Sequence, residues 1–296
     1  MRVLVLGGGG QVGRALDARA GAMGHDVYAF PRDGLDATDE AMLRAALETT
    51  GAQALVNAAA YTAVDRAESE PEAAHALNAD APGMHARVAA DLGLAYLHVS
   101  TDYVFAGDGR VPHKESDPCA PRSVYGSTKR AGEVAAWRSG GRVAILRTSW
   151  VFAPWGNNFV RTMLRLAAAR PELRVVDDQR GGPTSALDIA DAIFRMLPKL
   201  ADPAEADATG LFHFQGRPAV TWAAFADAIL DEGAKHGHPR PPVVRIATVD
   251  YPTPAVRPAN SVLDCARYAR VFDAAPPDWR LALPGAVAAL LGESKA

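Results

Sequence analysis

Tyr125 and Lys129 stand four residues apart, a spacing that places a phenol and an ammonium group on one face of a helix. The residues that follow, 131–137, continue as a helix-forming stretch. A free phenol has a pKa of about 10, and a neighbouring ammonium lowers it toward neutrality. The pair predicts acid–base chemistry in which Tyr125 exchanges a proton with a substrate oxygen. Alone, such a Tyr–Lys spacing usually occurs by chance on a protein surface, so the prediction depends on the motifs that precede it in the chain.

A hydroxyl group follows a predicted strand upstream of this pair. Residues 95–99 form an apolar run typical of a buried strand, and Ser100, Thr101 and Asp102 come directly after it. The carboxyl edge of an open parallel sheet is where ligands bind. We therefore expect the Thr101 hydroxyl to hydrogen-bond the same substrate oxygen as Tyr125.

Glycines follow the first predicted strand. The run from Gly7 to Gly13 satisfies GxxGxxG counted from Gly7 and GxGxxG counted from Gly8. Such glycines allow a tight turn, a close approach of the backbone to a pyrophosphate and close packing of the next helix, whose N-terminus favours phosphate. The alternative is a glycine-rich turn without a ligand. The glycine run follows the first strand of a chain in which strands and helices alternate, and this position favours dinucleotide binding.

The choice between nicotinamide cofactors depends on the end of the second strand. The predicted strand 26–30 is followed by Arg32 and Asp33. Arg32 would face a 2′-phosphate, whereas Asp33 would face a ribose diol. The sequence favours NADPH and leaves NADH as the alternative; Arg32 as a solvated loop cation also remains open.

Apolar runs and amphipathic stretches alternate in the first half of the chain. Continuous apolar strands separated by helices indicate an α/β fold, a doubly wound parallel sheet of the Rossmann kind. The expected strands are 3–6, 26–30, 54–57, 95–99 and 143–146, and the expected helices are 11–20, 38–49 (with Thr38 as N-cap) and 71–92. The regular alternation of apolar strands and helices ends near Phe152. We expect a dinucleotide-binding domain over 1–152 and a smaller α/β substrate-binding domain over 153–296, with some later segments returning to the first domain.

The composition excludes several classes of protein. The 296 residues are 49% hydrophobic and 22% charged, with a net charge of −3. This is globular composition without the charge expected for binding nucleic acid or an anionic membrane. Two cysteines cannot form a disulfide framework. Neither a signal peptide nor a long apolar run is evident, so we expect a cytoplasmic protein without a membrane span.

The order of these motifs resembles the extended short-chain dehydrogenase/reductase superfamily. The chain is most similar to the dTDP-4-dehydrorhamnose reductases, and the resemblance covers residues 1 to about 290. The segments that carry it are 56–68, 100–105, 147–152, 158–160, 178–184 and 257–263.

The resemblance implies an NAD(P)H-dependent reduction of the C4 ketone of dTDP-4-dehydro-β-L-rhamnose, the last step of dTDP-rhamnose synthesis. It implies that Tyr125 protonates the C4 oxygen, that Lys129 lowers the Tyr125 pKa and holds the nicotinamide ribose, and that Thr101 orients the ketone. The implied cofactor-binding residues are Gly7, Gly10, Gln11, Val12, Arg32, Asp36, Ala59, Ala60 and Tyr61, besides Tyr125 and Lys129. The implied substrate-binding residues are Thr62, Val64, Asp102, Tyr103, Trp150 and Arg257.

Several alternatives stay open. Trp150 could instead pack in a core, and Arg257 could form a structural salt bridge instead of facing a diphosphate. Gly8 and Gly9 replace a pair that is often non-glycine in the family, which loosens the loop without obstructing phosphate. We expect no metal, and a monomer or homodimer. The competing functions are another sugar-nucleotide reductase or epimerase of the superfamily, and a non-catalytic regulatory subunit of methionine adenosyltransferase.

Overall fold

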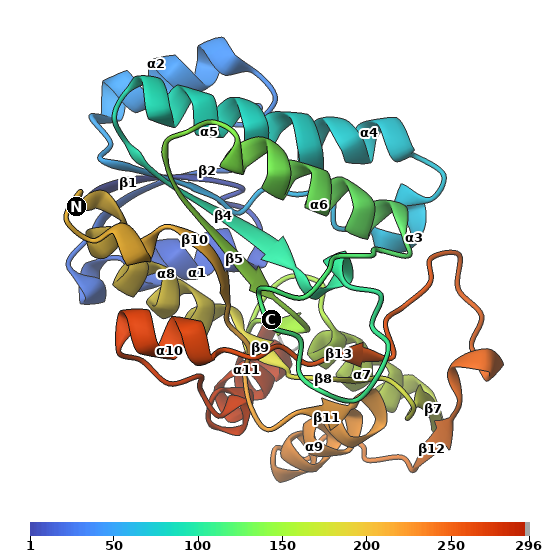
Figure 1. Cartoon of the computed structure of the whole chain (residues 1–296). Coiled ribbons are helices and arrows are strands. Elements are labelled where there is room, and N and C mark those ends of the chain that lie inside the picture. Colours follow the sequence, from blue (N-terminus) through green and yellow to red (C-terminus); the bar gives the residue numbers. More distant parts are fainter. Residues whose placement is uncertain (294–296) are drawn as a thin grey trace.

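The computed structural model describes residues 1–293 and is built around a six-stranded parallel sheet (Figure 1). Each strand pairs in parallel with its neighbours. The strands, in spatial order, are β10 (Gly210–His213), β5 (Arg142–Thr148), β4 (Ala95–Thr101), β3 (Ala54–Asn57), β1 (Arg2–Leu6) and β2 (Asp26–Phe30).

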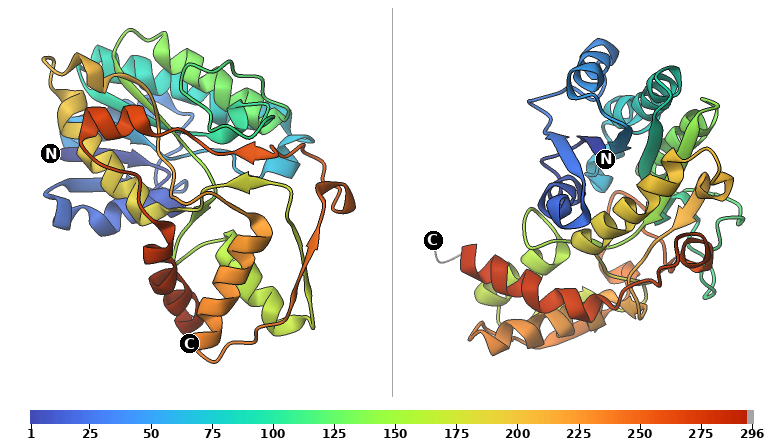
Figure 2. Two further views of the ribbon diagram at one scale, coloured as in Figure 1. Left: turned by 60° about the horizontal axis from the view of Figure 1, so that its bottom comes forward. Right: turned by 90° about the vertical axis from the view of Figure 1, so that its left-hand side faces the viewer.

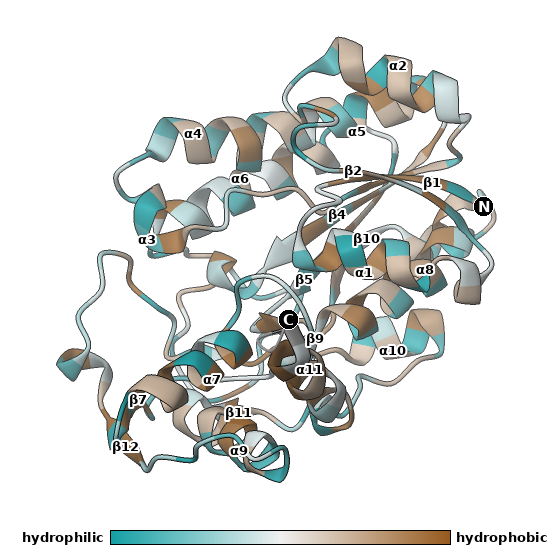
Figure 3. Cartoon of the chain, turned by 180° about the vertical axis from the view of Figure 1, so that it is seen from behind, coloured by the Kyte–Doolittle hydropathy of each residue, from teal (hydrophilic) through white to brown (hydrophobic). Residues whose placement is uncertain are grey.

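Helices cover both faces of this sheet because its central strands are apolar on both sides. α1 (Gln11–Arg19) and α8 (Ala186–Ala201) pack on one face, and α2 (Glu40–Thr50), α5 (Ala81–Asp91) and α6 (Val124–Trp137) pack on the other. Figure 3 shows hydrophobic colour along β1 and hydrophilic bands on α2. The predicted doubly wound α/β fold is confirmed. Within residues 1–293, no helix has both the length and the apolar character that a bilayer span requires.

One local prediction on the helix face needs correction. Asp39, and not Thr38, caps α2, because the Asp39 carboxylate accepts a hydrogen bond from the Met42 amide. The stretch 71–92, predicted to be mostly helical, is helical from Pro71 to Asp91 and contains a π-helical turn. It consists of α4 (Pro71–His75), a π-helical turn (Ala76–Asp80) and α5. Apolar periodicity does not reveal one extra residue in a turn.

A second group of helices lies beside the sheet, as Figure 2 shows in yellow-green, orange and red. α7 (Phe159–Ala169), α9 (Trp222–Lys235) and α11 (Trp279–Glu293) share an apolar cluster of their own. Short strands accompany them, namely β6 (Val151–Phe152) with β9 (Thr184–Ser185), β7 (Leu173–Val176) with β12 (Val243–Ile246), and β8 (Arg180–Gly181) between β11 (Val220–Thr221) and β13 (Asn260–Ser261). The late elements β10 and α8 belong to the main sheet and its cover, and α10 (Ala266–Phe272) packs beside β10.

The glycine loop lies where the strand order reverses. The chain passes from β1 to β2 on one side and then to β3 on the other, so the carboxyl ends of β1 and β3 flank the switch point where ligands bind in such sheets. Gly7 has a φ of +80°, and a Cβ on it would lie 2.6 Å from the Ala59 nitrogen. A Cβ on Gly13 would lie 2.2 Å from the Gly7 oxygen. The turn is therefore packed backbone against backbone.

A buried ion pair attaches α6 to the sheet. Arg147 on β5 donates from Nε and Nη2 to the two carboxylate oxygens of Glu133, each at 2.7 Å. Ser100 on β4 donates to the same carboxylate at 2.7 Å. Burial opposes the charge of Glu133, but the hydrogen bonds and charge of Arg147 outweigh it and hold the Glu133 pKa below its usual value. One carboxylate thus joins α6, β4 and β5.

Replacing Glu133 by Ala leaves Arg147 charged and buried without its partner. We expect Glu133→Ala to lower the free energy of unfolding by about 3–5 kcal/mol, the usual cost of breaking a buried pair. Arg130→Ala is the matched control, because Arg130 binds the same carboxylate from the surface and should cost about 1 kcal/mol or less. Denaturant unfolding measures both, and equal losses would contradict this role of the buried pair.

The glycine loop offers a second comparison. Gly13→Ala forces a shift of the loop backbone, and we expect a loss of roughly 1–3 kcal/mol in stability together with weaker dinucleotide binding. Gly9→Ala is the control, because its Cβ would meet only the Pro31 Cβ at 3.6 Å, an ordinary contact. Unfolding and dinucleotide titrations should separate the two variants; similar behaviour would argue against the packed turn.

Candidate active site

The hydroxyl groups of Thr101 and Tyr125 meet at the carboxyl edge of the sheet. Thr101 ends β4, and Tyr125 lies in the first turn of α6, which Ser123 caps by accepting a hydrogen bond from the Gly126 amide. The two side chains lie close enough for the Thr101 hydroxyl to act on the Tyr125 pKa, in the lowering direction. A Cβ on Gly126 would lie 2.2 Å from the Tyr103 oxygen, so this glycine allows the helix to approach the strand end. The structure thus brings together the two hydroxyls that the sequence pairs.

The electrostatics of Tyr125 differ from the expectation. Burial raises the Tyr125 pKa to about 12, the hydrogen bond with Thr101 acts in the lowering direction, and the charge of Asp102 raises it further. The expected lowering by Lys129 is absent in this arrangement, because the Lys129 amine is bound elsewhere. In the free protein Tyr125 is therefore a protonated phenol near neutral pH, which suits a proton donor.

Lys129 lies one helical turn after Tyr125 on α6 and is buried. Its Nζ donates to the Val99 carbonyl at 2.7 Å and lies 3.1 Å from Nε2 of His98. Burial lowers the Lys129 pKa to about 8, and the charge of Glu133 acts in the opposite direction. The amine is thus held against β4.

Asp102 begins the turn that follows β4. Its Oδ1 accepts a hydrogen bond from Thr101 at 3.1 Å, and its buried Oδ2 is without a hydrogen-bond partner. Burial raises the Asp102 pKa to about 6, and hydrogen bonds from Ser261 and Thr101 act in the lowering direction. An unpartnered carboxylate oxygen next to Thr101 is a ready acceptor for a hydroxyl group of a ligand. The Tyr103 ring lies edge-on to that of Tyr125, with 5.4 Å between the ring centres.

The predicted phosphate-binding residues gather at the start of α1. Gly10 precedes the helix and has no side chain to cap it, while Gln11 and Val12 form its first turn. Asn158 donates to the Gln11 side chain at 3.1 Å, and the Trp155 indole donates to the Gln11 carbonyl at 3.3 Å. Tight glycine packing and an uncapped helix start fit a dinucleotide pyrophosphate.

The two residues predicted to recognise the adenosine part lie after β2. Arg32 and Asp36 are both exposed. The amide and hydroxyl of Thr38 donate to Asp36 and lower its pKa. Arg32 lies close enough for its charge to act on Asp36 in the same direction. An exposed cation, Arg32, and an exposed carboxylate, Asp36, thus lie near each other after β2, where the adenosine part of a cofactor is expected.

The segment after β3 is held by two asparagines. Asn57 accepts a hydrogen bond from the Ala59 amide at 3.0 Å, and Asn78 accepts one from the Tyr61 amide at 2.8 Å. Ala60 lies between these anchors. The Tyr61 hydroxyl donates to Glu70 at 2.5 Å, which directs the phenol outward. Thr62 is exposed, and Val64 begins α3 (Val64–Ala67).

Trp150 and Arg257 have intramolecular partners. Trp150 has a φ of +48° and stacks on Trp222 with 3.5 Å between the ring centres. Arg257 forms a two-point ion pair with Asp65, at 2.8 and 2.7 Å. Arg257 as a residue that faces a diphosphate stays a prediction, and in this structure its guanidinium is paired with the Asp65 carboxylate. The salt bridge weighed as the alternative is the arrangement present.

Sequence analysis missed the polar residues that support this site. Asn57, Asn78 and His98 are fully buried, and Asn158 caps α7 besides binding Gln11. Asn57 and His98 interrupt otherwise apolar strands, which was the available signal. Asn78 lies in the π-helical turn, where helical spacing fails.

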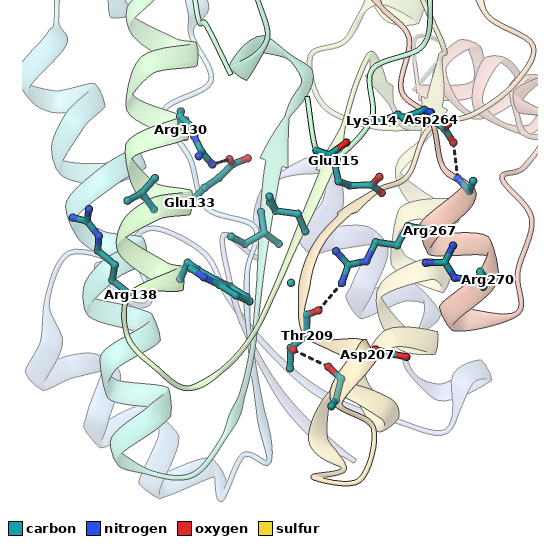
Figure 4. Close-up of a pocket in the computed structure, with 18 residues that line it drawn as sticks. Lys114, Glu115, Arg130, Glu133, Arg138, Asp207, Thr209, Asp264, Arg267 and Arg270 are labelled. Carbon is teal, nitrogen blue, oxygen red and sulfur yellow. Dashed lines mark hydrogen bonds and ion pairs between the residues drawn. The ribbon is translucent and has the colours of Figure 1, made fainter. Parts of the chain in front are cut away.

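A cavity of about 950 Å³ lies away from these residues, between α6, β10 and α10 (Figure 4). None of the predicted site residues lines it, although Glu133 reaches its wall. Charged side chains of both signs line it: the basic residues are Lys114, Arg130, Arg138, Arg267 and Arg270, and the acidic residues are Glu115, Glu133, Asp207 and Asp264. Among residues 1–293, no group of three or more His, Cys, Asp or Glu side chains could hold a metal.

Comparisons with known proteins agree with the geometry. The family model described as the RmlD substrate binding domain matches residues 1–291. A dTDP-4-dehydrorhamnose reductase of Sinorhizobium fredii is 41% identical, over 100% of this chain and 99% of the relative. One of Escherichia coli K12 is 39% identical, over 95% of each chain.

Solved structures give the same result. A dTDP-4-dehydrorhamnose reductase of Clostridium acetobutylicum matches with a TM-score of 0.90 and 30% identity, covering 98% of this chain and 100% of the other. One of Bacillus anthracis in complex with NADP matches with a TM-score of 0.86 and 30% identity, covering 96% and 97%. With the Thr101–Tyr125 pair and the glycine loop in place, these matches show that the chain belongs to the dTDP-4-dehydrorhamnose reductase family.

Proposed function

We propose that the chain reduces the C4 ketone of dTDP-4-dehydro-β-L-rhamnose to dTDP-L-rhamnose with a nicotinamide cofactor. The observation that carries this proposal is the placement of Thr101 at the end of β4 beside Tyr125 in the first turn of α6, with a phenol whose raised pKa keeps it protonated near neutral pH. Relatives that are about 40% identical over nearly the whole chain bear the name of this reductase.

The reduction adds one hydride and one proton across the carbonyl. The bound cofactor supplies the hydride to C4. Thr101 hydrogen-bonds the ketone oxygen and orients the carbonyl, and the Tyr125 phenol gives its proton to that oxygen as negative charge develops on it. The phenolate left on Tyr125 is stabilised when Lys129 is charged.

The remaining predicted residues surround these groups in the proposal. The unpartnered Oδ2 of Asp102 accepts a hydrogen bond from a sugar hydroxyl. Thr62, Val64, Tyr103 and Trp150 line the sugar nucleotide, and residues 153–296 mainly form the part that covers it. Gly7, Gly10, Gln11 and Val12 hold the pyrophosphate through main-chain N–H groups. Ala59, Ala60 and Tyr61 run beside the cofactor, whose ribose Lys129 and Tyr125 contact.

NADPH is the proposed cofactor, with NADH as the alternative. The exposed Arg32 after β2 is available to a 2′-phosphate. A relative in this family binds NADP in its crystal structure. Asp36 lies nearby on the adenine side.

Tyr125→Phe removes the donated proton and little else. We expect kcat to fall by about 10²-fold or more, while the affinity for NADPH stays within about twofold. Steady-state oxidation of NADPH with enzymatically generated dTDP-4-keto-L-sugar measures the first, and fluorescence titration of NADPH measures the second. An unchanged kcat would overturn the assignment of Tyr125.

The same assay on the unaltered protein tests the reaction itself. The product should be dTDP-L-rhamnose by mass and sugar configuration, with one NADPH oxidised per product. An epimerase would recycle its cofactor and show no net oxidation, and a regulatory subunit would show no turnover.

Arg32→Ala tests cofactor choice. We expect KM for NADPH to rise about tenfold and KM for NADH to change little, because the lost contact is to the 2′-phosphate alone. Arg110→Ala, which removes another exposed loop cation, is the control. If the unaltered protein uses NADH better than NADPH at equal concentration, the preference proposed here is wrong.

A further inference from the structure

A chain of buried polar side chains runs inward from Lys129. Lys129 Nζ lies 3.1 Å from Nε2 of His98 on β4, and Nδ1 of His98 lies 3.1 Å from the side-chain nitrogen of Asn57 on β3. All three side chains are buried, with no more than 1% of any residue exposed. The role proposed above for Lys129 does not use His98 or Asn57.

The direction of the first hydrogen bond is fixed by the backbone. The Ala59 N–H donates to the Asn57 Oδ1 at 3.0 Å, and an amide N–H cannot accept. The oxygen of Asn57 therefore faces Ala59, and its NH₂ group faces Nδ1 of His98. That NH₂ group can only donate, so Nδ1 is an acceptor and carries no proton.

The proton of His98 must then be on Nε2. Burial is the main cause that holds the His98 pKa well below its usual value, so the ring is neutral and has one N–H. Nε2–H points at Lys129 Nζ, which already donates to the Val99 carbonyl. An amine that accepts from Nε2–H while donating to Val99 is uncharged, because an ammonium has no lone pair.

Charging Lys129 has a structural cost. An ammonium needs Nε2 as its acceptor, which moves the ring proton to Nδ1 and sets two donors, Nδ1–H and the Asn57 NH₂, against each other. Turning the Asn57 amide relieves this clash but sets its NH₂ against the Ala59 N–H instead. Either arrangement leaves a buried donor unsatisfied.

We propose that His98 is a positioning residue: Asn57 orients its ring so that it donates a hydrogen bond to Lys129, which favours the uncharged amine, and protonation of Lys129 weakens the hold of Asn57 on Ala59. This proposal rests on the proposed function. The charge on Lys129, which stabilises the Tyr125 phenolate, is then coupled to the hydrogen bond between Asn57 and Ala59 in the segment beside the cofactor. The other titratable groups that act on this chain or contact it are Glu133 on α6, Tyr96 on β4 and His85 on α5. Glu133 alone favours the ammonium.

The tautomer of His98 tests the inference without any activity. Long-range ¹H–¹⁵N correlation spectra of the ¹⁵N-labelled full chain, free of cofactor, report which ring nitrogen carries the proton. The ring is assigned through bonds from its backbone, so no variant is required. We expect Nε2–H with Nδ1 unprotonated above pH 8, and Nδ1–H there would overturn the inference even if the reductase reaction is established.

His98→Gln tests the consequence for catalysis. Its amide can turn either oxygen or nitrogen to Lys129, so the ammonium is no longer opposed. A charged Lys129 is present below its pKa and lost as pH rises through it, so the basic limb of kcat/KM should move up by about 0.5–1 pH unit. His85→Gln is the matched control, because His85 is equally buried but binds the Ala37 carbonyl.

The basic limb should stay in place in His85→Gln. An unmoved limb in a folded, active His98→Gln would overturn the inference, and thermal unfolding of both variants checks that they fold. If the chain shows no reductase activity at all, the proposed function fails while the tautomer measurement still decides the role of His98.

Discussion

The buried ion pair of Glu133 and Arg147 is the interaction on which the candidate site depends. α6 carries Tyr125 and Lys129, and Glu133 lies one turn further along the same helix. Its carboxylate is held by Arg147 on β5 and by Ser100, the residue before Thr101. A buried pair contributes little net stability compared with apolar packing, but it is directional. Its geometry sets how far along β4 the helix lies, and hence whether the Tyr125 phenol meets the Thr101 hydroxyl.

Segments from the second half of the chain complete the site on the first half. Asn158 binds Gln11 next to the glycine loop, and Arg257 binds Asp65 at the start of α3. Each contact is polar and joins positions more than 140 residues apart in sequence. The sheet therefore supplies the reacting groups, and the later segments fix the loops around them.

The sequence was sufficient wherever the local structure depends on residues close together in the chain. The glycine loop and the Tyr125–Lys129 spacing are local patterns, and apolar runs identified the sheet strands. It was insufficient where the outcome depends on a distant partner. Arg257 could not be assigned without knowing that Asp65 faces it. The raised pKa of Tyr125 also required the structure, because spacing showed a nearby amine but neither the burial of the phenol nor the attachment of that amine to His98 and Val99.

The positions of the cations determine how a chain with a net charge of −3 can bind two polyanions. Three cations were expected to meet phosphates or the cofactor. Arg257 is neutralised by Asp65, and Lys129 lies inside the fold. Arg32 alone among these three is exposed, and its place after β2 suits the adenosine end of a cofactor. In the proposed function, the pyrophosphate is then held chiefly by main-chain N–H groups at the start of α1. That requirement explains why the glycine loop is packed so closely: dipoles fixed by the backbone need no side-chain charge, but they bind only if the turn keeps its shape.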